Sequence, residues 1–589
     1  MRDDLTKKQL GPDGRPKWAV FLPAISGFYA TFIGEQRQRE YVDPARFPAG
    51  LTDMEQLNWL NKQKSLFPYK WSLHSAGHAN LDLTKSDPTE DMLRQREKGT
   101  LLLGDSGGFQ IAKGLWEGEW RDPNCQAVKK KMQDCVTRKS ETRTVEVKDK
   151  SKKKVTKTVT VDLVKEYQKR IDSAQKQRKA VLTWLDDQAD YSMTLDIPTW
   201  VMLDEHTRVA TGITTHEEAV EATQYNNEYF IKHRRGVADG GTKILNVLQG
   251  SNHTDAESWY ETMKGYCDPK KYPGKNFDGW AMGAQNMCDM ELILKRIVTL
   301  RYDGLLQEGV HDWMHFLGTS KLEWAVLLTV IQKAVRKYVN PSFTISFDCA
   351  SPFLATANGQ VYYDNIHEPY GKWGYRMEAT ADDKKYALDT RKWSTAVVAD
   401  GLHKTWKESP VSDMWKMKDI CIYKPGVRNS SIPIEEFDFM NPDHYDVLPD
   451  KNKNDKWGKT SWDSFSYALL MAHNVWMHLT AVQEANQKFE SGIRPAMLQQ
   501  RGGDWDMFED IVEAIFAAPT KEDSLAIITE YRPYWVQIIG TGRGSKGEKN
   551  WVVDHTVEVN LFTAESPEVI IDDEPEFDES KLEALDAKA

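Results

Sequence analysis

The chain has 589 residues, more than one ordinary hydrophobic core holds, so its length predicts several domains or one barrel of about 250–300 residues with additions. Hydrophobic residues make up 40% and charged residues 28% of the chain, which excludes a disordered or fibrous protein. The net charge of −11 excludes a surface coated in positive charge, although a local basic strip can still bind a polyanion.

No segment predicts export or a membrane span. The first twenty residues lack the pattern of a signal peptide, and the apolar stretch 18–30 is too short and too interrupted to cross a bilayer. The six cysteines form no CxxC pair, which is typical of reduced thiols. We therefore expect a cytoplasmic protein that has no membrane partner.

Short apolar segments that end in polar or glycine-bearing tips predict strands. They are residues 100–108, 199–207, 243–251, 278–286, 314–321 and 343–351. Helical patterns follow three of these tips, at 216–235, 290–306 and 322–339. Strands that alternate with helices and carry polar groups at successive ends are typical of a (β/α)8 TIM barrel, an α/β fold. A doubly wound sheet is the alternative.

Residues 111 to about 195 interrupt this alternation and predict a large insertion. Within them, 142–161 alternates Thr and Val around a lysine-rich turn, the pattern of a β-hairpin, and 163–187 reads as a helix. Lysine and arginine dominate from 129 to 179. Two interpretations stay open: a solvated hairpin and helix, or a surface that contacts the phosphates of a nucleic acid.

The remaining domain organisation follows from where the alternation stops. Residues 1–365 form the predicted barrel with its insertion, and 366–563 form an α-rich C-terminal extension that contains a long helix at 462–489. Residues 564–589 are an acidic tail that we expect to be mobile.

Acidic and amide side chains lie at four of the predicted strand tips: Asp105, Asp204, Gln249 and Asp348. A barrel brings the carboxyl ends of its strands together at one face, so these residues would share one pocket. Any one of them alone could simply begin a turn. Together they suit chemistry at an anomeric carbon, where one carboxylate attacks and another manages protons.

The ordered motifs of the chain resemble those of the tRNA-guanine transglycosylases. The matching segments are "GDSGGFQ", "LDEHT", "VLQGS", "GWAMGAQN", "FLGT" and "FDCASPFLATANGQVYY", and they extend over about residues 70–365. Members of that family exchange a guanine base in a nucleic acid for a 7-deazaguanine. The resemblance implies that Asp348 is the nucleophile at C1′ and that Asp105 is the general acid/base.

The same resemblance implies a set of base-binding residues. Asp204 would accept the N1 and N2 protons of guanine, which adenine could not supply in the same way. Gln249 and the backbone of Gly283 and Ala284 would lie near O6. Phe109 would cover the face of the base, and Ser106 would complete the binding site.

Departures from the tRNA enzymes concern the elements that those enzymes use for tRNA. His206 replaces a cysteine, and the C-x-C-x-x-C part of a structural zinc site is missing. His473 lies where the zinc-binding histidine would be, yet Cys421 is the nearest upstream cysteine. We therefore expect no metal and no cofactor, with His473 a packed or capping residue.

This combination resembles the 7-deazaguanine DNA transglycosylases, the DpdA branch of bacteria and bacteriophages. The resemblance implies exchange of guanine in DNA for a 7-deazaguanine of the preQ0 type, which protects the DNA from restriction. Lys152, Lys153 and Lys154 are the predicted DNA contacts, and a homodimer stays open. The alternatives are exchange on tRNA, a catalytically inactive nucleic-acid-binding barrel, and a glycosidase that acts on free sugars or nucleosides.

Overall fold

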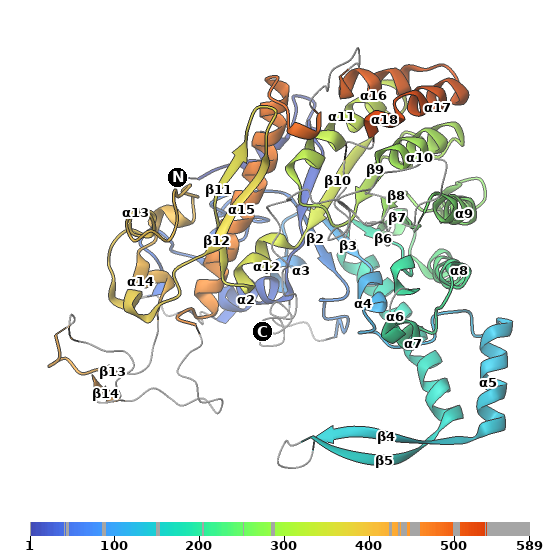
Figure 1. Cartoon of the computed structure of the whole chain (residues 1–589), viewed down its shortest axis with the longest axis horizontal. Coiled ribbons are helices and arrows are strands. Elements are labelled where there is room, and N and C mark those ends of the chain that lie inside the picture. The colour runs from blue at the N-terminus through green and yellow to red at the C-terminus, as the bar shows by residue number, and fades with distance from the viewer. Residues whose placement is uncertain are drawn as a thin grey trace.

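Eight parallel strands form one sheet that nearly closes into a barrel in this computed structural model (Figure 1). They run around the sheet in the order β1, β10, β9, β8, β7, β6, β3, β2. A parallel bridge between Ala24 and Leu73 connects the two outer strands. The arrangement is consistent with the predicted TIM-type barrel. The strand bounds are β1 Val20–Pro23, β2 Trp71–Ser75, β3 Leu101–Asp105, β6 Tyr191–Met193, β7 Lys243–Leu248, β8 Gly279–Met282, β9 Trp313–Phe316 and β10 Thr344–Cys349.

The structure describes residues 2–39, 42, 46–84, 90–148, 154–202, 205–250, 252–283, 289–422, 427–433, 436, 444–447, 460–498, 507–535 and 538. The helices of the barrel and its insertion are α1 Leu5–Gln9, α2 Gly27–Arg39, α3 Asp91–Arg94, α4 Gly108–Ala112, α5 Gln126–Arg138, α6 Leu163–Gln188, α7 Glu205–Thr211, α8 His216–His233, α9 His253–Met263, α10 Met290–Tyr302, α11 Leu322–Tyr338 and α12 Ser351–Ala357. The three helices predicted after strand tips correspond to α8, α10 and α11, which confirms them.

Five of the six predicted strands are confirmed, as β3, β7, β8, β9 and β10. The prediction of a strand at 199–207 is wrong, because Thr199–Met202 forms a 3-10 turn and α7 follows it. The strand at this place in the barrel is β6, within the range predicted as insertion. Pro198 explains the difference, since it lacks the N–H that a central strand needs and is suited to beginning a helical turn.

The predicted hairpin and helix of the insertion are confirmed. Strands β4 Ser140–Lys148 and β5 Lys154–Asp162 pair antiparallel, and we call these two strands the ribbon. Helix α5 packs on α6 around a small separate core of Val128, Tyr167 and Ile171. In Figure 1 the ribbon and α5 stand away from the barrel, on the side where α2, α4, α7 and α12 follow strand tips.

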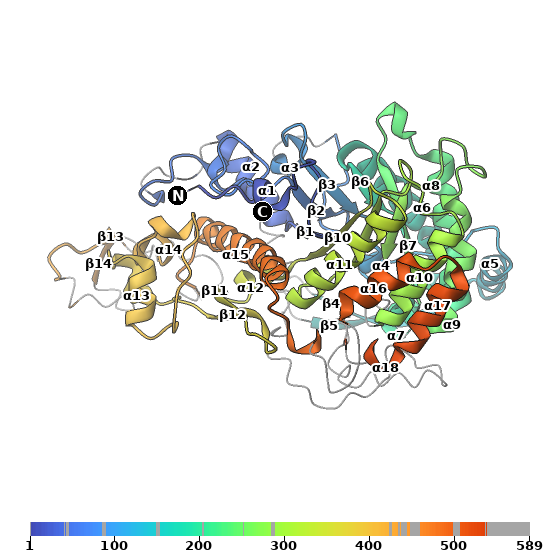
Figure 2. The same cartoon turned by 90° about the horizontal axis from the view of Figure 1, so that it is seen from above.

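The C-terminal region shares one hydrophobic core with the barrel. Its elements are β11 Gln360–His367, β12 Trp373–Ala379, α13 Trp393–Ala399, α14 Met417–Ile420, β13 Val427–Arg428, β14 Tyr445–Val447, α15 Ser464–Glu490, α16 Phe508–Ala517, α17 Lys521–Glu530 and α18 Arg532–Trp535. Helix α15 is the predicted long helix, and its Gln483 side chain donates to the Leu5 carbonyl at 2.9 Å. Figure 2 shows α15 running beside β11 and α12. The acidic tail lies outside the described residues.

No helix in the described part of the chain combines the length and the apolar character that crossing a bilayer requires.

Candidate active site

The C-terminal ends of the barrel strands bring the predicted site residues to one mouth. Asp105 ends β3, Asp348 lies at the tip of β10, and Gln249 directly follows β7. The charge of Asp348 contributes to a raised pKa of Asp105, which places the two carboxylates within electrostatic reach of each other. The barrel therefore joins residues that are more than 240 positions apart in the sequence.

The carboxylate of Asp348 is held by one oxygen. Its Oδ1 accepts a hydrogen bond from the Gly318 N–H at 2.9 Å and lies 3.1 Å from His315 Nε2. Within the described residues, both contacts are made by Oδ1. The side chain of Asp348 is 14% exposed. One oxygen is thus fixed while the other can reach a ligand in the mouth, which is the geometry that a nucleophilic carboxylate needs.

A buried chain of donors fixes the orientation of His315. The Trp313 indole N–H donates to Ser346 Oγ at 2.7 Å, and Ser346 Oγ lies 2.8 Å from His315 Nδ1. Because Ser346 accepts from Trp313, its own hydroxyl proton can point to Nδ1. His315 then carries its proton on Nε2 and donates it to Asp348. The chain of Trp313, Ser346 and His315 therefore orients the Asp348 carboxylate.

Replacing Ser346 with alanine should remove the middle of this chain. It leaves two buried nitrogens without a partner, so we expect the free energy of unfolding to fall by about 1–3 kcal/mol. The released His315 ring should also slow any chemistry at Asp348 by roughly tenfold. Urea unfolding measures the loss of stability, and the rate of the reaction at Asp348 measures the second effect.

The matched control for that variant is Ser192→Ala on β6. Ser192 Oγ is buried without a hydrogen-bond partner in the described structure, so losing it should change neither stability nor rate appreciably. Equal behaviour of the two variants would contradict the orienting role of Ser346.

Asp105 lies at the end of β3 and accepts a hydrogen bond from the neighbouring strand. Ser75 Oγ on the neighbouring β2 donates to its Oδ2 at 2.6 Å. Burial raises the pKa of Asp105, the hydrogen bond from Ser75 opposes this, and the charge of Asp348 raises the pKa further. A carboxyl group with a raised pKa keeps a proton more readily than a free carboxyl group, which suits a general acid/base.

The two glycines after Asp105 let the backbone turn tightly beside the site. Gly107 has a φ of 86°, and a Cβ there would lie 2.6 Å from the Trp116 ring. A Cβ on Gly108 would lie 2.8 Å from Asp196 Oδ1. Side chains at these positions would therefore displace both Trp116 and Asp196.

Asp196 is the site residue that the sequence analysis did not identify. It follows β6, and its Oδ2 accepts a hydrogen bond from Gln249 Nε2 at 2.8 Å. Burial raises the pKa of Asp196 to about 7, and the hydrogen bond from Gln249 opposes the shift while the charge of Asp105 adds to it. The signal was a Leu-Asp pair, which occurs at 195–196 as well as at 203–204.

Of the other predicted base-binding residues, two lie outside the described residues and three lie within them. Asp204 and Ala284 lie outside the described residues. The Gly283 N–H donates to the Leu248 carbonyl at 2.8 Å and is thus engaged within the barrel. Ser106 is buried and donates to the Thr194 carbonyl at 2.8 Å, which ties the tip of β3 to the segment after β6. Phe109 lies half-buried on α4.

Gln249 contributes an acceptor as well as a donor. Its amide nitrogen is engaged by Asp196, and its Oε1 is buried without a partner in the described structure. A buried unpaired acceptor is costly, so it marks a place where a ligand N–H would be bound favourably. Asp196 and Gln249 together present acceptors to a ligand that is rich in donors.

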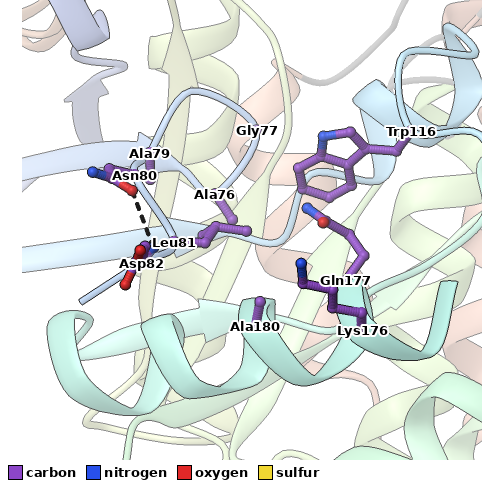
Figure 3. A pocket seen from close by; sticks show the side chains of 10 residues that line it. All are labelled: Ala76, Gly77, Ala79, Asn80, Leu81, Asp82, Trp116, Lys176, Gln177 and Ala180. Atoms are coloured by element: carbon purple, nitrogen blue, oxygen red, sulfur yellow. Dashed lines mark hydrogen bonds between the residues drawn. The ribbon is translucent and has the colours of Figure 1, made fainter. Parts of the chain in front are cut away.

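A pocket of about 510 Å³ opens next to this site (Figure 3). It lies between the loop after β2, Trp116 and helix α6. The lining residues are Ala76, Gly77, Ala79, Asn80, Leu81, Asp82, Trp116, Lys176, Gln177 and Ala180. Figure 3 shows Lys176 and Gln177 rising from α6 toward the Trp116 indole. The pocket combines an aromatic face with a cation and amides, which are groups that bind nucleotides.

His473 is packed in the core as a hydrogen-bonded residue. Its Nδ1 lies 2.8 Å from Ser409 Oγ and its Nε2 lies 2.8 Å from the Tyr362 carbonyl. Burial lowers its pKa to about 3. No group of three or more His, Cys, Asp or Glu side chains within the described ranges is placed to hold a metal ion. The absence of a metal stays a prediction.

These observations define the chain as an α/β protein with a nearly closed parallel barrel and an acidic mouth. A scan against models of known protein families finds no match for it. A search of curated proteins finds no similar protein.

Proposed function

We propose that the barrel exchanges guanine in DNA for a 7-deazaguanine base through a covalent intermediate on Asp348. The observation that carries this proposal is the asymmetric carboxylate of Asp348: within the described residues both of its hydrogen-bond contacts, to His315 and Gly318, are made by Oδ1, and the side chain is partly exposed. The order of motifs that resembles the guanine transglycosylases supports the same reaction class.

The reaction consists of two displacements at one carbon. Asp348 Oδ2 attacks C1′ and forms an ester bond, while the C1′–N9 bond breaks and Asp105 gives its proton to N9 of the departing guanine. The incoming base then loses its N9 proton to Asp105, attacks C1′ and releases the Asp348 carboxylate. Two inversions retain the β-configuration of the sugar. The raised pKa of Asp105 suits a group that gives and takes a proton in this cycle.

The pair of Asp196 and Gln249 supports recognition of a guanine-type edge. Guanine presents N1–H and N2–H donors side by side, and the pair offers carboxylate and amide oxygens as acceptors. Adenine presents its N1 as an acceptor there and would leave these oxygens unpaired. We therefore assign to Asp196 the base-reading role that the resemblance gave to Asp204.

The test is to incubate the protein with labelled guanine or a labelled 7-deazaguanine plus one polymer at a time. The polymers are duplex DNA, single-stranded DNA and tRNA. Label in DNA supports the proposal, and label in tRNA alone replaces it with exchange on tRNA. Binding of a polymer without any incorporation would favour the inactive nucleic-acid-binding barrel.

The lysines at 152–154 in the sequence give a prediction about DNA binding. Lys154 begins β5, whereas Lys152 and Lys153 lie outside the described residues. Replacing all three with alanine should weaken binding to every DNA sequence alike and lower the salt slope by about one unit per lost phosphate contact. Exchange at saturating DNA should be kept. An unchanged salt slope would show that the phosphates lie elsewhere.

A further inference from the structure

The ribbon presents a face of threonines that no described element covers. In its register Thr142 pairs with Thr160 and Thr144 with Thr158, and Thr156 lies on the same face. All five side chains are exposed. A two-stranded hairpin alone is only marginally stable in water, so strands of nine residues each that extend from the barrel would gain stability from a ligand on this exposed face.

The root of the ribbon is fixed to the barrel. Tyr167 on α6 donates to Glu119 at 2.8 Å, and Glu119 forms a buried ion pair with Arg121. Arg170 donates to the Gly118 carbonyl at 3.1 Å. Arg143 on β4 pairs with Glu166 on α6 at 2.8 Å. The ribbon is therefore presented in one direction, which reduces the entropy that binding must overcome.

Charge identifies the partner as a polyanion. Residues 125–179 contain 18 lysines and arginines against seven acidic residues, a net charge of +11 in a chain whose total is −11. Six of these lysines lie between 148 and 157 in the sequence, around the point where β4 ends and β5 begins. A basic arm on an acidic protein attracts a nucleic acid locally without coating the molecule in positive charge.

The shape of the ribbon distinguishes among nucleic acids. The major groove of B-form DNA, about 12 Å wide, admits a two-stranded β-ribbon, and nine residues extend about 30 Å, close to one helical turn. Duplex RNA has a deep and narrow major groove that excludes such an element. Single strands are bound by stacking on aromatic rings, and residues 140–162 contain no aromatic residue.

The position of the ribbon agrees with a duplex that crosses the mouth. Figure 1 places it on the side of the strand tips, and the view from above in Figure 2 places it beneath the barrel. Helix α6 connects the two sites, because Lys176 and Gln177 line the pocket of Figure 3 while Asp162, at its N-terminus, ends the ribbon.

We propose that the threonine face of the ribbon docks in the major groove of duplex DNA, so that the polymer bound at the mouth is double-stranded DNA. The Thr hydroxyls would bond to base edges and their methyl groups would contact thymine methyls. The inference rests on the proposed function for the reaction that follows binding. The docking itself can be measured without any exchange.

The experiment measures equilibrium binding of duplex DNA, single-stranded DNA and duplex RNA by full-length protein that carries Asp348→Asn. Two further variants add the same charge on opposite faces of one strand: Thr158→Glu on the threonine face and Val159→Glu, which stands opposite Arg143. Thr158→Glu should weaken duplex DNA binding at least tenfold more than Val159→Glu. It should also remove protection of guanine N7, a major-groove atom, from methylation.

A second variant covers the case in which a glutamate disrupts the hairpin. The Leu163 N–H donates to the Lys139 carbonyl at 3.0 Å, so two glycines can replace residues 140–162 between adjoining ends. This variant should lose at least tenfold in duplex DNA affinity and keep its melting temperature.

Three outcomes would overturn the docking proposal. They are equal effects of the two glutamates, tighter binding of single-stranded DNA than of duplex, and a ribbon-dependent dimer in sedimentation. A protein that passes these tests without exchanging bases would refute the proposed function alone, and an exchanging protein that fails them would refute the docking alone.

Discussion

Asp348→Asn should abolish base exchange, with a loss of roughly 10⁴-fold or more, and should leave the protein folded. An amide oxygen is too weak a nucleophile to displace guanine from C1′. It can still accept the hydrogen bonds that His315 and Gly318 make to Oδ1, so the local structure persists. Wild-type protein mixed with labelled DNA should yield a covalent adduct on a denaturing gel, and the variant should yield none.

Two comparisons make that result specific. Asp239→Asn changes an exposed acid in the turn before β7, far from the strand tips, and should keep both adduct and exchange. Asp105→Asn should lose turnover yet still bind guanine, because it removes the proton carrier and keeps the base-reading pair. Wild-type exchange by Asp348→Asn would remove Asp348 from the mechanism.

The sequence predicted the parts of the site that end long apolar strands. Asp105 ends a strand of five residues, Asp348 is the last residue but one in a strand of six, and Gln249 follows another strand of six. Asp196 was missed because β6 has only three residues, too few for an apolar run to stand out. The second Leu-Asp pair, at 203–204, follows a longer apolar segment that forms a 3-10 turn.

The support for Asp348 could not be predicted, because it depends on register between strands. Ser346 on β10 stands directly opposite His315 on β9, and Asp348 lies two residues further on the same face. A shift of one residue would turn all of these side chains away from one another. Single-sequence patterns identify strands and their tips, whereas the register is set by the packing of the whole barrel.

The strands β1 and β2 were missed for a related reason. Pro23 ends the first, and the polar residues Ser72 and His74 interrupt the second. His74 is nevertheless buried, with its Nδ1 2.8 Å from the Ile25 carbonyl. A polar side chain that is satisfied inside the fold gives the same sequence pattern as an exposed one.

Asp196 should make stability and base binding respond to pH in opposite directions. Burial raises its pKa from the ordinary 3.8 to about 7, so the folded state holds a proton that the unfolded state releases. The stabilising contribution of the protonated form is fully present below pH 3.8 and is lost as the pH rises through about 7. Above that pH, Asp196→Asn should raise the free energy of unfolding by up to about 4 kcal/mol.

Guanine affinity should instead rise with pH, because the ionised carboxylate of Asp196 accepts a hydrogen bond from a purine N–H better than the protonated carboxyl does. Affinity should rise roughly tenfold between pH 6 and pH 8 for the wild type, as a group with a pKa near 7 loses its proton. Asp196→Asn should bind guanine more weakly than the wild type at pH 8 and show little of this rise. Calorimetric titration with free guanine, beside urea unfolding at the same pH values, measures both quantities.

A variant that gains stability at pH 8 but binds guanine as tightly as the wild type would show that Asp196 is a buried acid without a role in reading the base. A variant that loses both stability and binding would show instead that the carboxylate holds Gln249 and the mouth together, because a role confined to the ligand cannot destabilise the free protein.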